Sequence, residues 1–211
     1  NGDGTFGGSF TPTSSTEIEI TVIDDKGSFT TVPLMKVELI DPAGYVYNSI
    51  THTRITEAVV TCYWWDENNS KWVIWDAPTY GQINPQVTPF NDQFDYSFLV
   101  PKGKYYVYAT ATGFYPYQSS TLEVIAEPVY HDIYMEPLPV LTSITVLPQS
   151  VVLGLNGTYS FTAMGYDQYA RPMGGVECNW NSTIGTITTG IFTAPNTVTT
   201  GIITAASGTV Q

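Results

Sequence analysis

The sequence predicts an all-β protein made of two tandem β-sandwiches, and three observations support this fold class. Short segments in which apolar and polar residues alternate recur along the 211 residues and are separated by turn-forming residues. β-Branched and aromatic residues are abundant, and no segment shows helical periodicity beyond one turn. A stiff segment with two prolines, residues 136–139, divides the strand-like segments into two groups. We therefore expect a tail at residues 1–16, a first sandwich at 17–137 and a second at 138–211.

The first sandwich is predicted from segments with clear alternation. Ile18 and Ile20 point to one face of a strand whose other face is polar. A second strand through Val37 and Leu39 is expected to end at a turn formed by residues 41–44. Further strands are predicted at residues 96–100, 105–112, 121–126 and 129–135.

A long insertion within this sandwich contains an aromatic hairpin. Residues 62–65 and 72–75 are apolar and flank the polar turn 66–71, a pattern typical of two strands with aromatic cross-strand pairs. The tryptophans allow two interpretations, because they either pack on each other within the hairpin or form an exposed platform for a sugar. These are Trp64, Trp65, Trp72 and Trp75.

The second sandwich is predicted from shorter alternating segments. Ile144 and Val146 alternate with polar residues, and Tyr159, Phe161 and Ala163 do the same. Three further strands are expected at residues 176–180, 191–193 and 201–206.

Composition restricts the possible partners and the compartment. The net charge is −12 with only 7 Lys and Arg residues, so a nucleic-acid backbone would be repelled. No run of 18 apolar residues occurs, so we expect no membrane span. The sequence starts at Asn1 rather than Met, which either a secreted protein with a removed signal peptide or a trimmed sequence would explain. We therefore expect an extracellular, cell-surface protein.

Three Asn-x-Ser/Thr triplets are candidate sites for N-linked glycans. Each lies beside turn-like sequence, where a glycan could be carried. The acceptor residues are Asn68, Asn156 and Asn181.

The two cysteines, Cys62 and Cys178, fall in different predicted domains. A disulfide between them would have to bridge domains or subunits, whereas free buried thiols are the simpler interpretation.

No pattern of catalytic or metal-binding residues is found, so we expect no enzyme activity, no cofactor and no metal. His52 and His131 have no cysteine or carboxylate at metal-ligand spacing. The segment 1–4 and the pair Asp24-Asp25 do not complete a calcium loop. The candidate carboxylates are interpreted as turn-forming residues: Asp66, Glu67, Asp76, Asp92 and Asp95.

Two family resemblances refine the fold. The segments 20–24, 37–44 and 100–107 resemble the carboxypeptidase-regulatory-like (transthyretin-like) β-sandwiches. Trp180 and the segments 185–187, 190–195 and 201–205 resemble a bacterial-type immunoglobulin-like repeat. The resemblances imply two immunoglobulin-like sandwiches and leave the activity open.

The second resemblance has one departure, because the sequence stops after residues 201–206 at the turn where the family continues into a final strand. We expect an exposed strand edge beside a groove, and such an edge needs a cover. The tail offers one, since Phe6 and Phe10 lie on one face of a strand with small residues between them. The donor strand is Thr5, Phe6, Gly7, Gly8, Ser9, Phe10 and Thr11. The expected acceptor residues are Tyr159, Phe161, Ala163, Ile202, Thr204 and Ala206, although a slip of one residue would exchange the inward and outward sets.

The whole arrangement resembles archaeal extracellular threads, in which pilus-like filaments form from identical subunits. This resemblance implies a structural subunit that polymerises head-to-tail by donor-strand complementation and serves adhesion or cell–cell contact. The alternative is a carbohydrate-binding or accessory module of a larger secreted enzyme or adhesin, which the aromatic hairpin would favour.

Overall fold

The computed structural model describes residues 16–23, 29–37, 42–125 and 127–211. These residues form strands, turns and one short 3-10 helix, η1 (Ala77–Tyr80), with no α-helix among them. The prediction of an all-β protein is therefore confirmed. No helix in the described ranges is long and apolar enough to cross a membrane.

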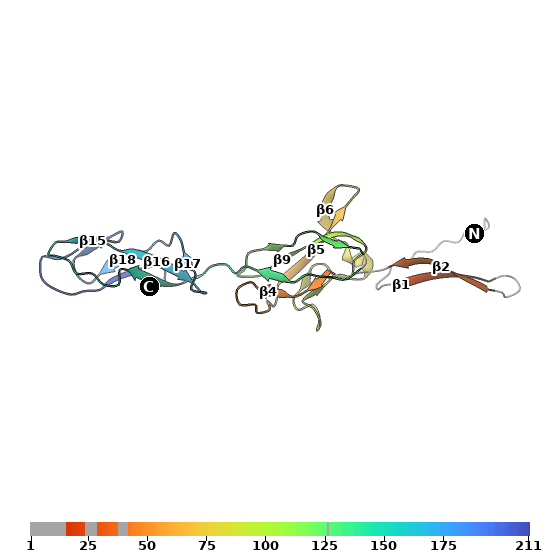
Figure 1. Cartoon of the computed structure of the whole chain (residues 1–211), viewed down its shortest axis with the longest axis horizontal. Helices are drawn as coiled ribbons and strands as arrows, with labels where there is room; N and C mark the ends of the chain where they lie inside the picture. The colour runs from red at the N-terminus through yellow and green to blue at the C-terminus, as the bar shows by residue number, and fades with distance from the viewer. Residues whose placement is uncertain (1–15, 24–28, 38–41, 126) are drawn as a thin grey trace. The chain divides into compact units, whose positions relative to one another are not determined.

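The chain divides into two compact units, Asn1–Leu138 and Pro139–Gln211, which we call unit 1 and unit 2 (Figure 1). The predicted donor strand, Thr5–Thr11, and the calcium candidates at 1–4 and 24–25 lie outside the described residues. Unit 1 begins with a hairpin of β1 (Thr16–Ile23) and β2 (Phe29–Val37), which pair antiparallel with an irregularity between Ile18 and Glu19.

The main sheet of unit 1 has the order β10-β9-β5-β6, and β11 and β7 pair with β9 and β5. Residues at every second position of its two long strands point into the core, because side chains of a strand alternate between faces. Val60 and Cys62 of β5 and Tyr105 and Val107 of β9 are buried. The strand bounds are β5 (Val59–Asp66), β6 (Lys71–Ile74), β7 (Gln86–Val87), β9 (Gly103–Thr110), β10 (Tyr117–Gln118) and β11 (Leu122–Val124).

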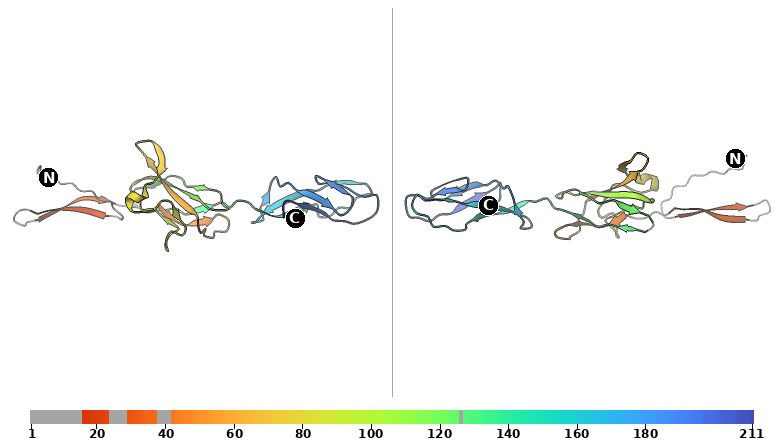
Figure 2. Two further views of the ribbon diagram at one scale, coloured as in Figure 1. Left: turned by 180° about the vertical axis from the view of Figure 1, so that it is seen from behind. Right: turned by 45° about the horizontal axis from the view of Figure 1, so that its top comes forward.

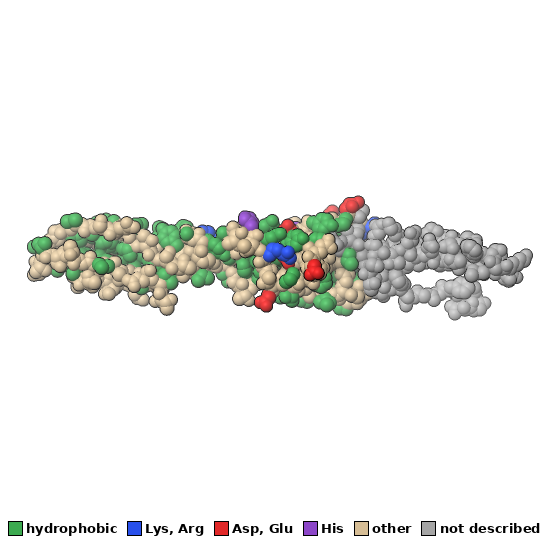
Figure 3. Space-filling model, turned by 90° about the horizontal axis from the view of Figure 1, so that it is seen from below, with side chains coloured by type: hydrophobic (Ala, Val, Ile, Leu, Met, Phe, Trp, Pro, Cys, Tyr) green, Lys and Arg blue, Asp and Glu red, His purple; other side chains and the backbone are tan. Residues whose placement is uncertain are grey.

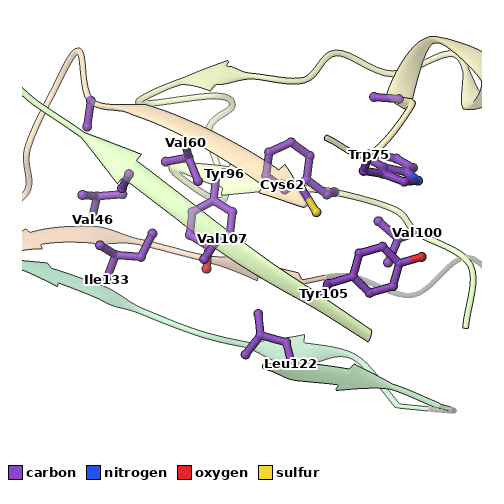
Figure 4. Close-up of a cluster of buried hydrophobic side chains, with 14 of the residues drawn as sticks. Val46, Val60, Cys62, Trp75, Tyr96, Val100, Tyr105, Val107, Leu122 and Ile133 are labelled. Atoms are coloured by element: carbon purple, nitrogen blue, oxygen red, sulfur yellow. The ribbon is translucent and has the colours of Figure 1, made fainter. Parts of the chain in front are cut away.

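A second layer of short strands covers this core. It consists of the sheet β12-β3-β8 and the parallel pair β13-β4. Val46, Tyr96 and Ile133 from this layer meet the buried side chains of the main sheet (Figure 4). Unit 1 is thus consistent with a β-sandwich with a continuous apolar interior. The strands are β3 (Pro42–Gly44), β4 (Val46–Asn48), β8 (Tyr96–Ser97), β12 (Val129–Tyr130) and β13 (Ile133–Met135).

Side-chain amides replace missing strand pairing in the loop after β6. Gln82 accepts from the Leu99 N–H at 2.9 Å and donates to the Leu99 carbonyl at 2.6 Å. Gln86 makes the same pair of bonds with Ser97, and Asn84 makes it with Cys62. Unit 1 therefore satisfies backbone groups that lie beside irregular chain, as a buried interior requires.

The segment predicted as a turn at residues 41–44 is instead partly a strand, because Pro42–Gly44 forms β3. Gly44 pairs with Tyr96 on one side, and its Cα faces the backbone of His131 on the other. A Cβ placed on Gly44 would lie 2.2 Å from the His131 carbonyl oxygen. The glycine is needed for this close approach of two backbones rather than for a turn.

Unit 2 contains three small sheets with the orders β14-β16-β17, β15-β20-β19 and β18-β21 (Figure 2). Phe161 and Phe192 are 7% and 5% exposed and meet at 6.4 Å between ring centroids. The strands are β14 (Leu141–Leu147), β15 (Thr158–Ser160), β16 (Thr162–Asp167), β17 (Pro172–Met173), β18 (Asn179–Ser182), β19 (Thr186–Thr188), β20 (Ile191–Thr193) and β21 (Ile203–Ala206).

We predict that Gly44→Ala lowers the free energy of unfolding of unit 1 by about 1–3 kcal/mol, because the methyl group forces β3 away from His131. Gly174→Ala, a Gly-to-Ala change in unit 2, is the control for the unfolding of the whole chain, since a Cβ there meets no atom within 4 Å. Denaturant unfolding followed by tryptophan fluorescence measures both. Equal effects of the two substitutions would show that the close approach is not required.

Candidate functional site

An apolar groove of about 360 Å³ lies in unit 2. One wall is the extended segment 151–155, and the other is formed by residues 197–201 with Ile203 of β21. Phe161, Phe192 and Ile184 line it between these walls. Two segments that are far apart in the sequence therefore border one groove. None of the residues that line it carries a charge.

Apolar side chains along the groove remain exposed to solvent. Val152 is 98% exposed and Val198 is 96% exposed, and Leu155 is exposed as well. Among the described residues, buried apolar side chains of unit 2 are limited to Phe161, Phe192 and Ala205, whereas the core of unit 1 has 17 buried residues. An apolar surface that its own domain does not bury is typical of a binding groove.

The backbone on both sides of the groove is only partly paired within the described chain. No N–H from Val151 to Leu155 donates a hydrogen bond there. β21 pairs with β18 along one edge, and its other edge has no ladder partner among the described strands. β14, which leads into the 151–155 wall, lies close to β21. The groove thus offers an apolar floor between two backbone edges, which is the arrangement that an added β-strand fills.

The structure places the predicted acceptor residues only partly at this groove. Phe161 lines it, and Ile203 rather than Ile202 or Thr204 contributes from β21. Ala205 of the same strand is buried, so the inward set of β21 is shifted by one residue from the predicted set. The other predicted residues lie elsewhere: Tyr159 is exposed on β15, and Ala163 and Ala206 are half-buried on β16 and β21.

Sequence reasoning missed most of the groove wall. Residues 151–155 are apolar but do not alternate, so they fitted no strand pattern, and residues 197–200 resembled a polar loop. The signal that could have found them is the run Val151-Val152-Leu153, three residues after Pro148, which is too apolar for a free loop.

Charge is scarce throughout unit 2, whose charged residues are Asp167, Glu177 and Arg171. Uncharged atoms cover nearly the whole face of this unit that Figure 3 shows. The Asp167 carboxylate accepts hydrogen bonds from the Arg171 backbone and side chain at 2.9 and 2.8 Å. Burial opposes the charged form, but these bonds and that from the Tyr169 N–H outweigh it and lower the pKa of Asp167. This ion pair does not line the groove.

The three candidate glycosylation sites occupy exposed positions of different kinds. Asn68 lies in the turn between β5 and β6, where the Asp66 carboxylate accepts hydrogen bonds from the backbone N–H groups of Asn68 and Asn69. Asn156 has a left-handed backbone with φ of 58° just before β15. Asn181 lies within β18 opposite Thr204. The side chains of all three asparagines are accessible.

Both cysteines are free thiols, Cys62 in the core of unit 1 and Cys178 half-buried in unit 2. Burial raises the pKa of the Cys62 thiol far above its ordinary value, which makes it an unreactive core residue.

The histidines and carboxylates do not converge on one site. His131 is half-buried, its Nε2 lies 2.9 Å from the Tyr117 hydroxyl, and burial lowers its pKa. His52 is exposed on a loop. Asp95 is buried against Arg54 and accepts the Val46 N–H at 2.9 Å, so it ties a loop to β4. Within the described ranges, no group of three His, Cys, Asp or Glu residues could hold a metal ion.

The remaining candidate carboxylates belong to local turns or the surface. Asp66 orders the β5–β6 turn, and the hydrogen bond from the Asn69 side chain lowers its pKa. Asp76 accepts from the Thr79 hydroxyl at the start of η1. Glu67 and Asp92 are exposed.

The four tryptophans of the hairpin do not form one platform. Trp75 is 3% exposed and packs in the core against Tyr80 and Phe98. Trp65 and Trp72 form a cross-strand pair with ring centroids 5.4 Å apart. Trp64 occupies the opposite face of β5 and is partly exposed.

Comparison with protein-family models gives no match for this sequence. Comparison with curated proteins gives no significant match.

We predict that Phe192→Ala unfolds unit 2 while unit 1 stays folded. Removing a buried Phe costs about 3–5 kcal/mol, and unit 2 has few other buried apolar residues with which to compensate. Hydrogen exchange of the full chain, read separately for peptides of each unit, measures this. Phe90→Ala, at an exposed loop position of unit 1, is the control and should leave exchange unchanged. Continued protection of β18 and β21 in the Phe192 variant would contradict the prediction.

Proposed function

We propose that this protein is a structural subunit of an extracellular cell-surface filament that polymerises head-to-tail by donor-strand complementation. In this proposal both units are immunoglobulin-like sandwiches, and residues 5–11 of one copy enter the groove of unit 2 in the next copy. The filament would serve adhesion or cell–cell contact.

The observation that carries the proposal is the open groove between residues 151–155 and β21. Its floor is apolar and its two backbone edges are only partly paired within the described chain. An extended strand bonded along these edges would gain roughly 0.5–1.5 kcal/mol for each ladder hydrogen bond. It would also cover side chains such as Val152 that are exposed in the single chain.

The tail has the composition that such a groove requires. Phe6 and Phe10 are four residues apart and thus share one face of an extended strand, with Gly8 between them on that face. Burying each Phe would contribute about 1.5–3 kcal/mol. Residues 5–11 carry no charge, which matches the uncharged groove. Sixteen extended residues reach roughly 50 Å, enough to enter another subunit.

We predict that the full chain forms filaments and that deletion of residues 1–12 abolishes them. Negative-stain microscopy and sedimentation measure the outcome. The double substitution Phe6→Ala with Phe10→Ala should also abolish filaments, because it removes the apolar face of the donor. The matched control, Thr5→Ala with Thr11→Ala, alters the opposite face and should preserve them.

Three results would contradict the proposal. The full chain could remain monomeric, filaments could persist without residues 1–12, or the tail could stabilise unit 2 without causing polymerisation. The last result would show that the tail fills the groove of its own chain.

We further predict that assembly is nearly independent of salt and pH. The groove and residues 5–11 contain no ionisable side chain, so neither screening nor protonation between about pH 4 and pH 9 changes the contact itself. The critical concentration for assembly at about 0.05 and 1 M NaCl should agree within roughly threefold. A steep dependence on salt would assign the contact to charged surfaces of unit 1 instead.

The alternative function is a carbohydrate-binding or accessory module of a larger secreted protein. The partly exposed rings of Trp65 and Trp72 favour it. The two functions differ in one respect: a module of this kind would bind polysaccharide whether or not residues 1–12 are present.

A further inference from the structure

A row of four aromatic side chains lies on the outer face of the main sheet in unit 1. Tyr63 and Tyr106 stack with ring centroids 4.7 Å apart and planes inclined by 9°. Trp72 meets Tyr106 edge-on at 4.8 Å, and Trp65 meets Trp72 at 5.4 Å. The strand register places these four residues on the face opposite buried Cys62. We call Tyr63, Tyr106, Trp72 and Trp65 the aromatic row.

The aromatic row is incompletely covered by the rest of unit 1. Its four side chains are only half-buried, so part of their ring surface meets solvent. Ile74, which pairs with Tyr63 and shares its face, is 57% exposed. The row offers ring surfaces, tyrosine hydroxyls and indole N–H groups but no charge, so its chemistry suits a neutral, hydroxyl-rich partner.

The Asn68 triplet lies at the tip of the hairpin that carries this row. The pair Trp65–Trp72 is followed directly by the pair Asp66–Lys71, which closes the turn that contains Asn68. One pair of residues advances a strand by about 3.4 Å, so the turn begins one step from the two indole rings. The hairpin projects from the body of unit 1 (Figure 1).

The turn is ordered in a way that leaves the Asn68 side chain free. Asp66 Oδ1 accepts the backbone N–H of Asn68 at 3.0 Å and that of Asn69 at 3.3 Å. Asp66 Oδ2 accepts from the Asn69 side chain at 2.7 Å. The Asn68 amide takes part in none of these bonds and is exposed, so it is accessible to a glycosyl-transferring enzyme.

We propose that Asn68 carries an N-linked glycan whose first sugars pack on the aromatic row at Trp65 and Trp72. A pyranose ring has an apolar face of C–H groups that stacks on an aromatic ring, while its hydroxyls reach the tyrosine and indole polar groups. The covalent link makes this contact intramolecular. The stacked conformation of the glycan is therefore populated even if the attraction between sugar and ring is weak. The glycan would shield the rings that the sheet itself leaves uncovered. This inference is independent of filament formation.

The other two triplets provide internal controls. Asn156 and Asn181 lie in unit 2, whereas the aromatic row belongs to unit 1. Neither asparagine belongs to the hairpin that carries the row, so neither glycan is tethered beside it in the sequence. Only the Asn68 glycan is expected to stabilise unit 1.

The test uses the full chain secreted by a eukaryotic host that attaches high-mannose N-glycans. Glycopeptide mass spectrometry reads the occupancy of each asparagine, and calorimetry reads the melting temperature of unit 1. Asn68→Gln should lower this temperature by roughly 2–8 °C in the glycosylated protein and by less than about 1 °C in protein from a bacterial host. Asn181→Gln should not change it in either host.

The substitution Trp65→Ala completes a double-mutant cycle with Asn68→Gln. Trp65→Ala alone destabilises unit 1, but in its presence the glycan should no longer raise the melting temperature. An unoccupied Asn68, an occupied site without stabilisation, or stabilisation that survives Trp65→Ala would each overturn the proposal. Binding of free mannan oligosaccharide by the unglycosylated chain, lost on Trp65→Ala, would overturn it by assigning the row to an external polysaccharide.

Discussion

The open edge of unit 2 is the constraint on which the behaviour of this protein depends. Segment 151–155 and Ile203 of β21 line one apolar groove, no N–H of 151–155 donates a hydrogen bond within the described chain, and β21 has a ladder partner on one edge only. A small domain buries little apolar surface. Its free energy of unfolding is a small difference between the large stabilisation from apolar burial and the large cost in conformational entropy. Unit 2 has three well-buried apolar residues among those described, so a strand that closes the groove would add a large share of its core. In the proposed assembly, binding of the donor strand would therefore also complete the core of this unit.

Unit 1 pairs the backbone groups at its strand ends with side chains of its own. Where its strands end early, the amide groups of Gln82, Asn84 and Gln86 bond to backbone N–H and carbonyl groups as a peptide would. Its two layers enclose a continuous core. The residues that line the groove of unit 2 are aliphatic residues, phenylalanines, threonines, two glycines, an alanine and a proline, and none of them has a side-chain amide.

The sequence was sufficient to predict the all-β class, because alternation is a local property that survives in the folded chain. The aromatic hairpin was also predicted, and β5 and β6 pair Trp65 with Trp72 across it. Short strands without alternation were not predictable. Pro42–Gly44 resembles a turn in isolation, and its role as β3 depends on contact with His131, which is distant in sequence.

The candidate site was predicted in kind but only partly in its residues. A strand edge beside an apolar groove could be expected from the family resemblance, and Phe161 follows from alternation in its own segment. The inward face of β21 could not be assigned from the sequence, since Ile202 and Ile203 are equally apolar. Which of the two points inward depends on how the strand pairs and packs in the folded unit. The 151–155 wall escaped prediction for a different reason, because a segment that joins no ladder among the described strands has no need to alternate.

The position of donor and acceptor along the chain decides what kind of assembly the groove can support. The donor segment lies near the start of unit 1 and the groove lies in unit 2, so in the proposed assembly each copy uses two different surfaces. Contacts between two unlike surfaces do not stop at a dimer. After two copies bind, one still has a free donor segment and the other still has a free groove. They extend as an open series unless the geometry closes a ring. A groove and a tail without charge also leave the affinity to shape and apolar burial, which are the properties that Phe6, Gly8 and Phe10 can provide. Because neither the groove nor the tail carries a charge, electrostatic steering does not guide their contact. The register of the tail in the groove is then the main source of specificity for this contact.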